Sequence, residues 1–104
     1  MNTRELGNLG EDLAVNLLQS KGYKILCRNF HSKLGEIDIV AQDCNVLVFV
    51  EVKTRWSKEF GLPEEAITPR KIRLIIKTGQ YYQLLNPKTP EALRIDAVLA
   101  ELDT

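Results

Sequence analysis

The sequence predicts an α/β sandwich in which helices flank a mixed central sheet, in the order helix, three strands, helix, strand. Three observations support this class. The chain opens with leucines at helical spacing, continues with three runs rich in β-branched residues separated by turn residues, and repeats a helical pattern before one last run. With 104 residues and a hydrophobic content of 44%, it has room for one core. We therefore expect residues 1–104 to form a single domain.

The first expected helix covers residues 2–21. It opens with two good N-cap residues, Asn2 and Thr3, and stops at Gly22. Its leucines recur at helical spacing, which indicates an amphipathic helix. We expect the apolar stripe to consist of Leu6, Leu9, Leu13 and Leu17.

Three strands are expected next, at residues 23–30, 35–42 and 46–54. Residues 43–45 are turn formers, so the second and third strands are expected to form a hairpin. A loop rich in turn formers is expected over residues 56–65.

The second helix is expected to begin at Thr68-Pro69, which supply an N-cap and a first-position proline. We expect it to continue to about Leu85, before Asn86-Pro87. The fourth strand is expected at residues 94–102. This order gives the helix-and-sheet layers of the predicted sandwich.

Two charged residues interrupt the apolar pattern of the third strand. Its first half is apolar on both faces, as in a central strand covered on both sides. Glu51 and Lys53 then follow on the face of Leu47 and Phe49. Charges at the end of a central strand cost several kcal/mol if they stay unpaired, so something must compensate them.

The second strand offers a partner for these charges. With a two-residue turn at residues 44–45, Asp38 lies directly opposite Glu51, and Glu36 lies opposite Lys53. Two facing carboxylates repel each other unless one takes up a proton or a cation lies between them. Carboxylate oxygens favour a hard ion, so we expect Mg²⁺ at Asp38 and Glu51. The alternative is an ordinary cross-strand ion network at the rim of the sheet.

Such a site suits the hydrolysis of phosphodiesters. The metal would polarise the scissile phosphate and lower the pKa of a bound water. Lys53 would hold that water or offset the charge on the pentacovalent phosphorus.

A strip of small residues in the first helix adds a further candidate. Gly7, Gly10 and Ala14 share one side of the helix and would let another backbone approach closely, and Glu11 lies at the edge of this strip. Glu11 would then reach the metal directly or through a water. The alternative is an ordinary surface glutamate.

A family resemblance is carried by the strings GEDLA (10–14), GY (22–23), RN (28–29), GEID (35–38), VFVEVKTR (48–55), FG (60–61), EAIT (65–68) and RID (94–96). In these strings the chain closely resembles the YraN family of small bacterial proteins, over nearly its whole length. That family is similar to archaeal Holliday junction resolvases and is placed in the PD-(D/E)xK nuclease superfamily. The resemblance implies a restriction-endonuclease-like, resolvase-like fold.

The resemblance also implies a set of site residues. Glu11, Asp38, Glu51 and Lys53 would occupy the active-site positions of the resolvase-like branch, which binds Mg²⁺ or Mn²⁺. The chain departs from the pattern in two places: Asp38 follows Ile37 instead of proline, and the chain stops soon after the fourth strand, where family members continue with a short segment. The second departure suggests a trimmed or lost final element. Resolvases act on two-fold symmetric junctions, so a homodimer is expected by analogy.

Nucleic acid, and DNA in the first place, is the expected partner. The 14 basic and 14 acidic residues give a net charge of zero, so binding requires a local basic patch. Arg55 continues the face of Lys53 and is expected to contact phosphate. The second helix adds candidates near its N-terminus, where anions are favoured: Arg70, Lys71, Arg73 and Lys77. The alternative for all of these residues is a solvated surface.

We expect the protein to lie in the cytoplasm, away from membranes. No apolar run approaches the roughly 18 residues that a membrane span requires, and the first residues are polar and acidic, unlike a secretory signal.

Three functions stay open. The leading one is a Mg²⁺-dependent endonuclease acting on structured or branched DNA. The second is a non-catalytic nucleic-acid-binding module, which would bind with a steep salt dependence but cleave nothing. The third is a protein-interaction or assembly module on the same fold.

Overall fold

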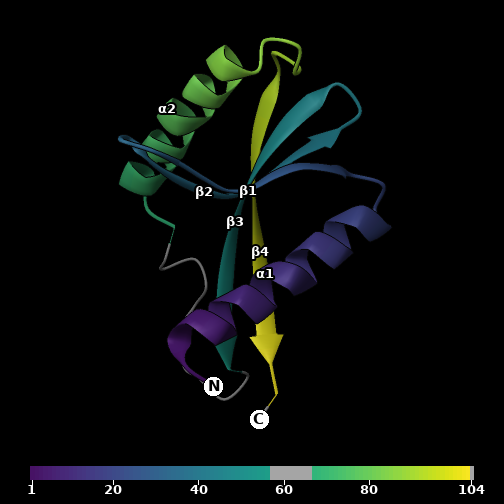
Figure 1. The fold of residues 1–104 in the computed structure, drawn as a ribbon, viewed down its shortest axis with the longest axis vertical. Helices are drawn as coiled ribbons and strands as arrows, with labels where there is room; N and C mark the ends of the chain where they lie inside the picture. Colours follow the sequence, from purple (N-terminus) through teal and green to yellow (C-terminus); the bar gives the residue numbers. More distant parts are fainter. Residues whose placement is uncertain (57–66, 104) are drawn as a thin grey trace.

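The computed structural model describes residues 1–56 and 67–103 (Figure 1). The expected α/β class and the order helix, three strands, helix, strand are confirmed. The elements are α1 (Thr3–Ser20), β1 (Lys24–Ser32), β2 (Gly35–Asp43), β3 (Val46–Trp56), α2 (Pro69–Leu85) and β4 (Leu93–Leu102). Except for Trp56, which ends β3, the loop expected over residues 56–65 lies outside the described residues, as do FG (60–61) and the first half of EAIT (65–68).

The four strands form one mixed sheet in the order β1-β2-β3-β4. The first three pair antiparallel, whereas β3 and β4 run parallel, so the chain must cross over between them, and α2 makes that crossover. The helices cover opposite faces of the sheet (Figure 1). Ala14 and Leu18 of α1 pack with one set of strand residues, and Ile75 and Tyr82 of α2 pack with the other.

The hairpin between β2 and β3 has the expected register. Cys44 adopts a left-handed conformation with φ 53°, which suits a tight two-residue turn. Paired positions extend from Asp43 with Val46 to Ile39 with Val50. Asp38 and Glu51 are the next positions along the two strands, just beyond the paired segment.

The buried face of α1 differs from the expected leucine stripe. Gly10, Glu11, Ala14 and Leu18 are buried, whereas three of the four leucines, Leu9, Leu13 and Leu17, are exposed by 38%, 43% and 43%. The reason is a close approach to the sheet. A Cβ atom at Gly10 would lie 1.9 Å from the Oγ1 atom of Thr54 in β3, so small side chains determine which face of the helix can contact the sheet.

Helix α2 begins as expected, because the Thr68 side chain accepts a hydrogen bond from the Lys71 N–H group and Pro69 is the first helical residue. Gly79 lies on its buried face against Phe49 of β3. Within residues 1–56 and 67–103, neither helix is long and apolar enough to cross a membrane.

Candidate active site

A cleft of about 340 Å³ opens beside α1, where the pairing of β2 and β3 ends. Glu11 and Asn29 line it together with Asp38, Lys53 and Glu36. These residues come from α1 and from strands β1, β2 and β3. The structure therefore brings three of the four expected catalytic residues, Glu11, Asp38 and Lys53, to one cleft.

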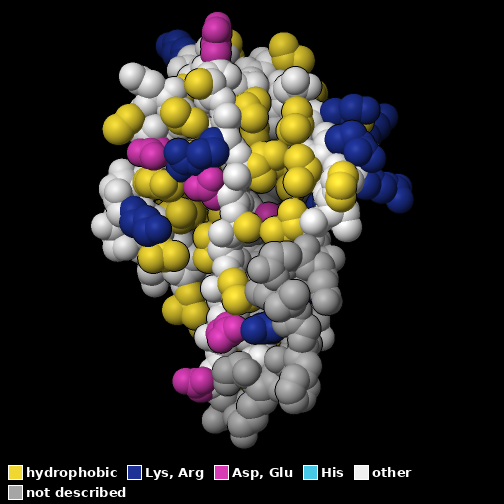
Figure 2. Space-filling model, turned by 180° about the vertical axis from the view of Figure 1, so that it is seen from behind, with side chains coloured by type: hydrophobic (Ala, Val, Ile, Leu, Met, Phe, Trp, Pro, Cys, Tyr) yellow, Lys and Arg dark blue, Asp and Glu magenta, His cyan; other side chains and the backbone are white. Residues whose placement is uncertain are grey.

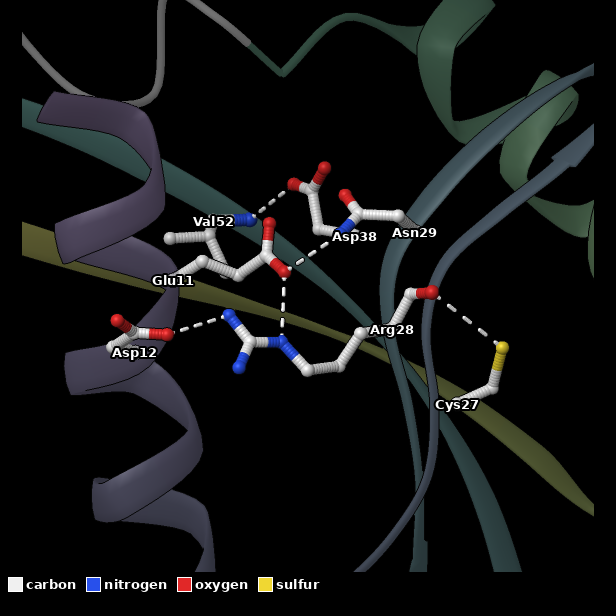
Figure 3. Close-up of polar contacts among 7 residues, drawn as sticks. All are labelled: Glu11, Asp12, Cys27, Arg28, Asn29, Asp38 and Val52. Carbon is white, nitrogen blue, oxygen red and sulfur yellow. Dashed lines mark hydrogen bonds and ion pairs between the residues drawn. The ribbon is translucent and has the colours of Figure 1, made fainter. Parts of the chain in front are cut away.

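Asp38 lies at the point where the antiparallel pairing stops. Its Oδ2 atom accepts a hydrogen bond of 2.7 Å from the backbone N–H of Val52 (Figure 3). The side chain of Asp38 thus supplies the acceptor that a backbone carbonyl oxygen of β2 would supply in a regular strand pair. Burial raises the pKa of this carboxyl group to about 6, against the opposing effect of the Val52 hydrogen bond. The charges of Glu51, Glu11 and Glu36 contribute to the same rise. A bound cation would relieve this accumulation of negative charge.

Glu11 is 8% exposed, which excludes the alternative of a surface glutamate. Its Oε1 atom accepts two hydrogen bonds, one of 2.9 Å from Arg28 Nε and one of 3.0 Å from Asn29 Nδ2 (Figure 3). Arg28 also donates from Nη2 to Asp12 Oδ1 at 2.7 Å. Glu11 is thus fixed by two residues of β1.

Glu51 is not among the residues that line this cleft. It forms an ion pair with Lys71 in the first turn of α2. Its side chain is only 12% exposed. Lys71, expected to bind phosphate, is therefore the counter-ion of an expected metal ligand.

The donor set is consistent with a hard divalent ion at the cleft. Two of the three carboxylates that line the cleft each keep one oxygen, Asp38 Oδ1 and Glu11 Oε2, without a hydrogen bond to the described residues. Among residues 1–56 and 67–103, however, no three His, Cys, Asp or Glu side chains lie close enough together to hold a metal. The third expected ligand, Glu51, is held by Lys71 instead. Binding of Mg²⁺ or Mn²⁺ stays a prediction.

The expected phosphate-binding residues are divided among three environments. Lys53 is exposed and lines the cleft. Arg55 donates from Nε and Nη2 to Glu101 Oε1 of β4, at 3.1 and 2.7 Å. Exposed positions on α2 are occupied by Arg70, Arg73 and Lys77. Figure 2 shows basic side chains gathered at the edge of the molecule where α2 lies.

Asp96 pairs with Arg94. Arg94 donates from Nε and Nη2 to the two carboxylate oxygens of Asp96, at 2.9 and 3.1 Å. It also contacts Asp43 and the Tyr23 hydroxyl group. The two residues lie two positions apart on one face of β4, and this short separation was the signal for the pair in the sequence.

Sequence reasoning also missed the residues that hold the site carboxylates. Arg28 and Asn29 are adjacent polar residues in the middle of β1, which was the available signal for their contact with Glu11. Lys71 carried no comparable signal, because 20 positions and a crossover separate it from Glu51.

Comparison with known proteins gives the chain a family. The model of the uncharacterised protein family UPF0102 matches residues 10–100. A UPF0102 protein of Caldicellulosiruptor saccharolyticus is 56% identical over 82 residues, which are 79% of this chain and 70% of the relative. One from Syntrophomonas wolfei is 50% identical over 95 residues, 91% and 83% of the two chains. One from Persephonella marina is 47% identical over 92 residues, 88% and 79%. The chain therefore belongs to the uncharacterised protein family UPF0102, the YraN family that its sequence strings resemble.

Proposed function

We propose that this protein is a Mg²⁺- or Mn²⁺-dependent endonuclease that hydrolyses phosphodiester bonds in structured or branched DNA. One observation carries the proposal: Asp38, with its pKa raised to about 6, shares a cleft with the buried Glu11 and with Lys53. Strongly perturbed carboxyl groups in a cleft are typical of sites that handle protons or cations. The choice of DNA follows from the resemblance to the YraN family, which is similar to Holliday junction resolvases.

Each residue has a role in this reaction. Asp38 and Glu11 would hold the divalent ion through the carboxylate oxygens that lack hydrogen bonds. The ion would supply charge stabilisation at the phosphate and a lower pKa for the attacking water. Lys53, exposed at the same cleft, would place its ammonium group against the charge that develops on the phosphorus.

Glu51 requires a separate step, because Lys71 occupies its carboxylate. Glu51 would join the site when Lys71 turns towards a DNA phosphate. Lys71 is suited to this exchange, since its side chain is 42% exposed and an ammonium group on a flexible stem adopts new partners readily. DNA would then remove the counter-ion from Glu51 and complete the acidic site.

Substrate binding would extend from the cleft onto α2. Arg70, Arg73 and Lys77 are exposed there and would neutralise phosphates, so binding should weaken as salt increases. A homodimer would present two such sites to a two-fold symmetric junction.

The proposal is tested with labelled four-way-junction, flap, single-stranded and linear duplex DNA, each incubated with Mg²⁺ or Mn²⁺. We expect cleavage by the wild-type protein and none by Asp38→Asn, Glu51→Gln or Lys53→Ala. Glu91→Gln and Lys88→Ala, at exposed positions between α2 and β4, are the matched controls and should cleave normally.

Two other outcomes would replace the proposal. Salt-sensitive binding without cleavage of any substrate would identify a non-catalytic nucleic-acid-binding module. No DNA or RNA binding at low salt, together with a tight protein partner, would identify an assembly module.

A further inference from the structure

We infer that Asn29 is a positioning residue of the cleft, which holds Glu11 by one carboxylate oxygen so that the other remains available to a divalent cation. The inference rests on the proposed metal site, and it assigns a task to a residue outside the expected catalytic set. It follows from the backbone of β1, the contacts of Glu11 and the chemistry of the asparagine side chain.

The backbone of β1 is interrupted at Asn29. Its φ angle is 55°, a left-handed conformation that is uncommon for any residue other than glycine and that asparagine tolerates better than most. The neighbouring residues pair normally with β2, Arg28 with Ile39 and Phe30 with Ile37. Asn29 therefore leaves the extended strand conformation for a single residue, at the position opposite Asp38. Backbone conformations of this kind concentrate at functional sites.

This local departure directs the Asn29 amide to the cleft. Its Nδ2 atom donates to Glu11 Oε1 at 3.0 Å, and Asn29 lines the same cleft as Glu11 and Asp38. Since Arg28 Nε donates to the same oxygen at 2.9 Å, Oε1 has two donors. Glu11 Oε2 receives none from the described residues.

The two donors differ in what they do to the charge of Glu11. Arg28 is a cation and competes electrostatically with a metal, but it shares its guanidinium group with Asp12. Asn29 is neutral, so it orients the carboxylate without cancelling the charge that a metal requires. Partners that orient metal-binding side chains in this way typically change metal affinity by 10- to 100-fold when they are removed.

Few residue types satisfy these conditions together. Glycine accepts the left-handed backbone but has no amide donor. Alanine lacks the donor and also disfavours this conformation. Asparagine combines the backbone tolerance, the donor and the absence of charge.

The test measures the affinity of the full chain for Mn²⁺ by the electron paramagnetic resonance signal of the free ion, without DNA. Asn29→Gly should lower the affinity about tenfold while it keeps the backbone conformation accessible. The matched control is Cys44→Gly, which makes the same kind of change at a second left-handed non-glycine residue, in the exposed turn between β2 and β3, and should bind Mn²⁺ as the wild type does. Asn29→Ala removes the same donor and serves as a second variant if Asn29→Gly does not fold.

A double-mutant cycle shows whether Asn29 acts through Glu11. If it does, Asn29→Gly should have no further effect on Mn²⁺ affinity in a Glu11→Gln background. Wild-type affinity in Asn29→Gly, or an undiminished effect in the Glu11→Gln background, would overturn the inference while leaving the metal site intact. If Glu11→Gln and Asp38→Asn both bind Mn²⁺ as tightly as the wild type, the proposed metal site fails, and the inference fails with it.

Discussion

The contact between Gly10 and Thr54 predicts opposite effects for the same substitution at two positions of α1. A Cβ atom at Gly10 would lie 1.9, 2.6 and 2.8 Å from the Oγ1, Cγ2 and Cβ atoms of Thr54. A Cβ atom at Gly7 would meet nothing within 4 Å. Replacement of each glycine by alanine therefore separates the helix propensity of alanine from the packing of α1 on the sheet.

The magnitudes follow from these distances. Alanine stabilises a helix interior by about 1 kcal/mol relative to glycine, so Gly7→Ala should raise the free energy of unfolding by up to that amount. Gly10→Ala gains the same propensity, but carbon atoms normally approach to about 3.5–4.0 Å, so α1 or Thr54 must move by more than about 1 Å. Thr54 is β-branched and stiff, and overpacking of this kind costs about 1–3 kcal/mol. We expect Gly10→Ala to be about 2 kcal/mol less stable than Gly7→Ala.

Urea unfolding followed by circular dichroism measures both free energies. A thermal scan should show a corresponding gap of about 10 °C between the two variants, since about 1 kcal/mol shifts the Tm of a domain of this size by roughly 4–8 °C. Equal stability of Gly10→Ala and Gly7→Ala would refute the close approach of α1 to β3, and with it our explanation of why the leucines are exposed.

Two further predictions concern the carboxylates of the site. The pKa of Asp38 is raised to about 6 in the folded protein and is about 3.9 in an unfolded chain. The folded protein therefore holds the Asp38 proton more tightly than the unfolded chain does. This contribution to the free energy of unfolding is fully present below about pH 4 and is lost as the pH rises through 6. Asp38→Asn should therefore be more stable than the wild type at pH 7, by about 1–2 kcal/mol once solvent screening of this partly exposed group is included. The difference should disappear near pH 4, and an unchanged difference in urea unfolding between these pH values would contradict the burial of this carboxyl group. Lys71→Met removes the counter-ion of Glu51 and should raise the pKa of Asp38 above about 6, as measured by carbon NMR titration of the Asp38 carboxyl group, whereas Arg70→Met, one position away and exposed, should leave it unchanged.

Local signals in the sequence were sufficient for much of the fold. The N-cap residues Asn2 and Thr68 mark the start of each helix, and the two-residue turn sets the hairpin register because a turn of fixed length allows only one pairing. Turn and cap chemistry acts over a few residues, so a single sequence contains it.

The packing of α1 and the contacts of the site could not be predicted in the same way. Spacing identifies the leucines as one stripe of a helix, but only the position of β3 decides that Gly10 must face the sheet. Similarly, Glu51 and Lys71 meet because α2 crosses over the sheet, and Glu11 meets Asn29 because β1 leaves its regular path for one residue. Such contacts depend on the relative placement of whole elements.

The close approach of α1 to the sheet also bears on how far a tilt of this helix would displace the residues of the cleft. Gly10 makes the close contact with Thr54, and Glu11 is the next residue along the helix. With a rise of about 1.5 Å per residue, a tilt of about 10° about this contact would displace Thr3, seven positions away, by about 2 Å, but Glu11 by only about 0.3 Å. Glu11 therefore lies beside the closest contact of the helix with the sheet, where a tilt of α1 would move it least relative to Asp38.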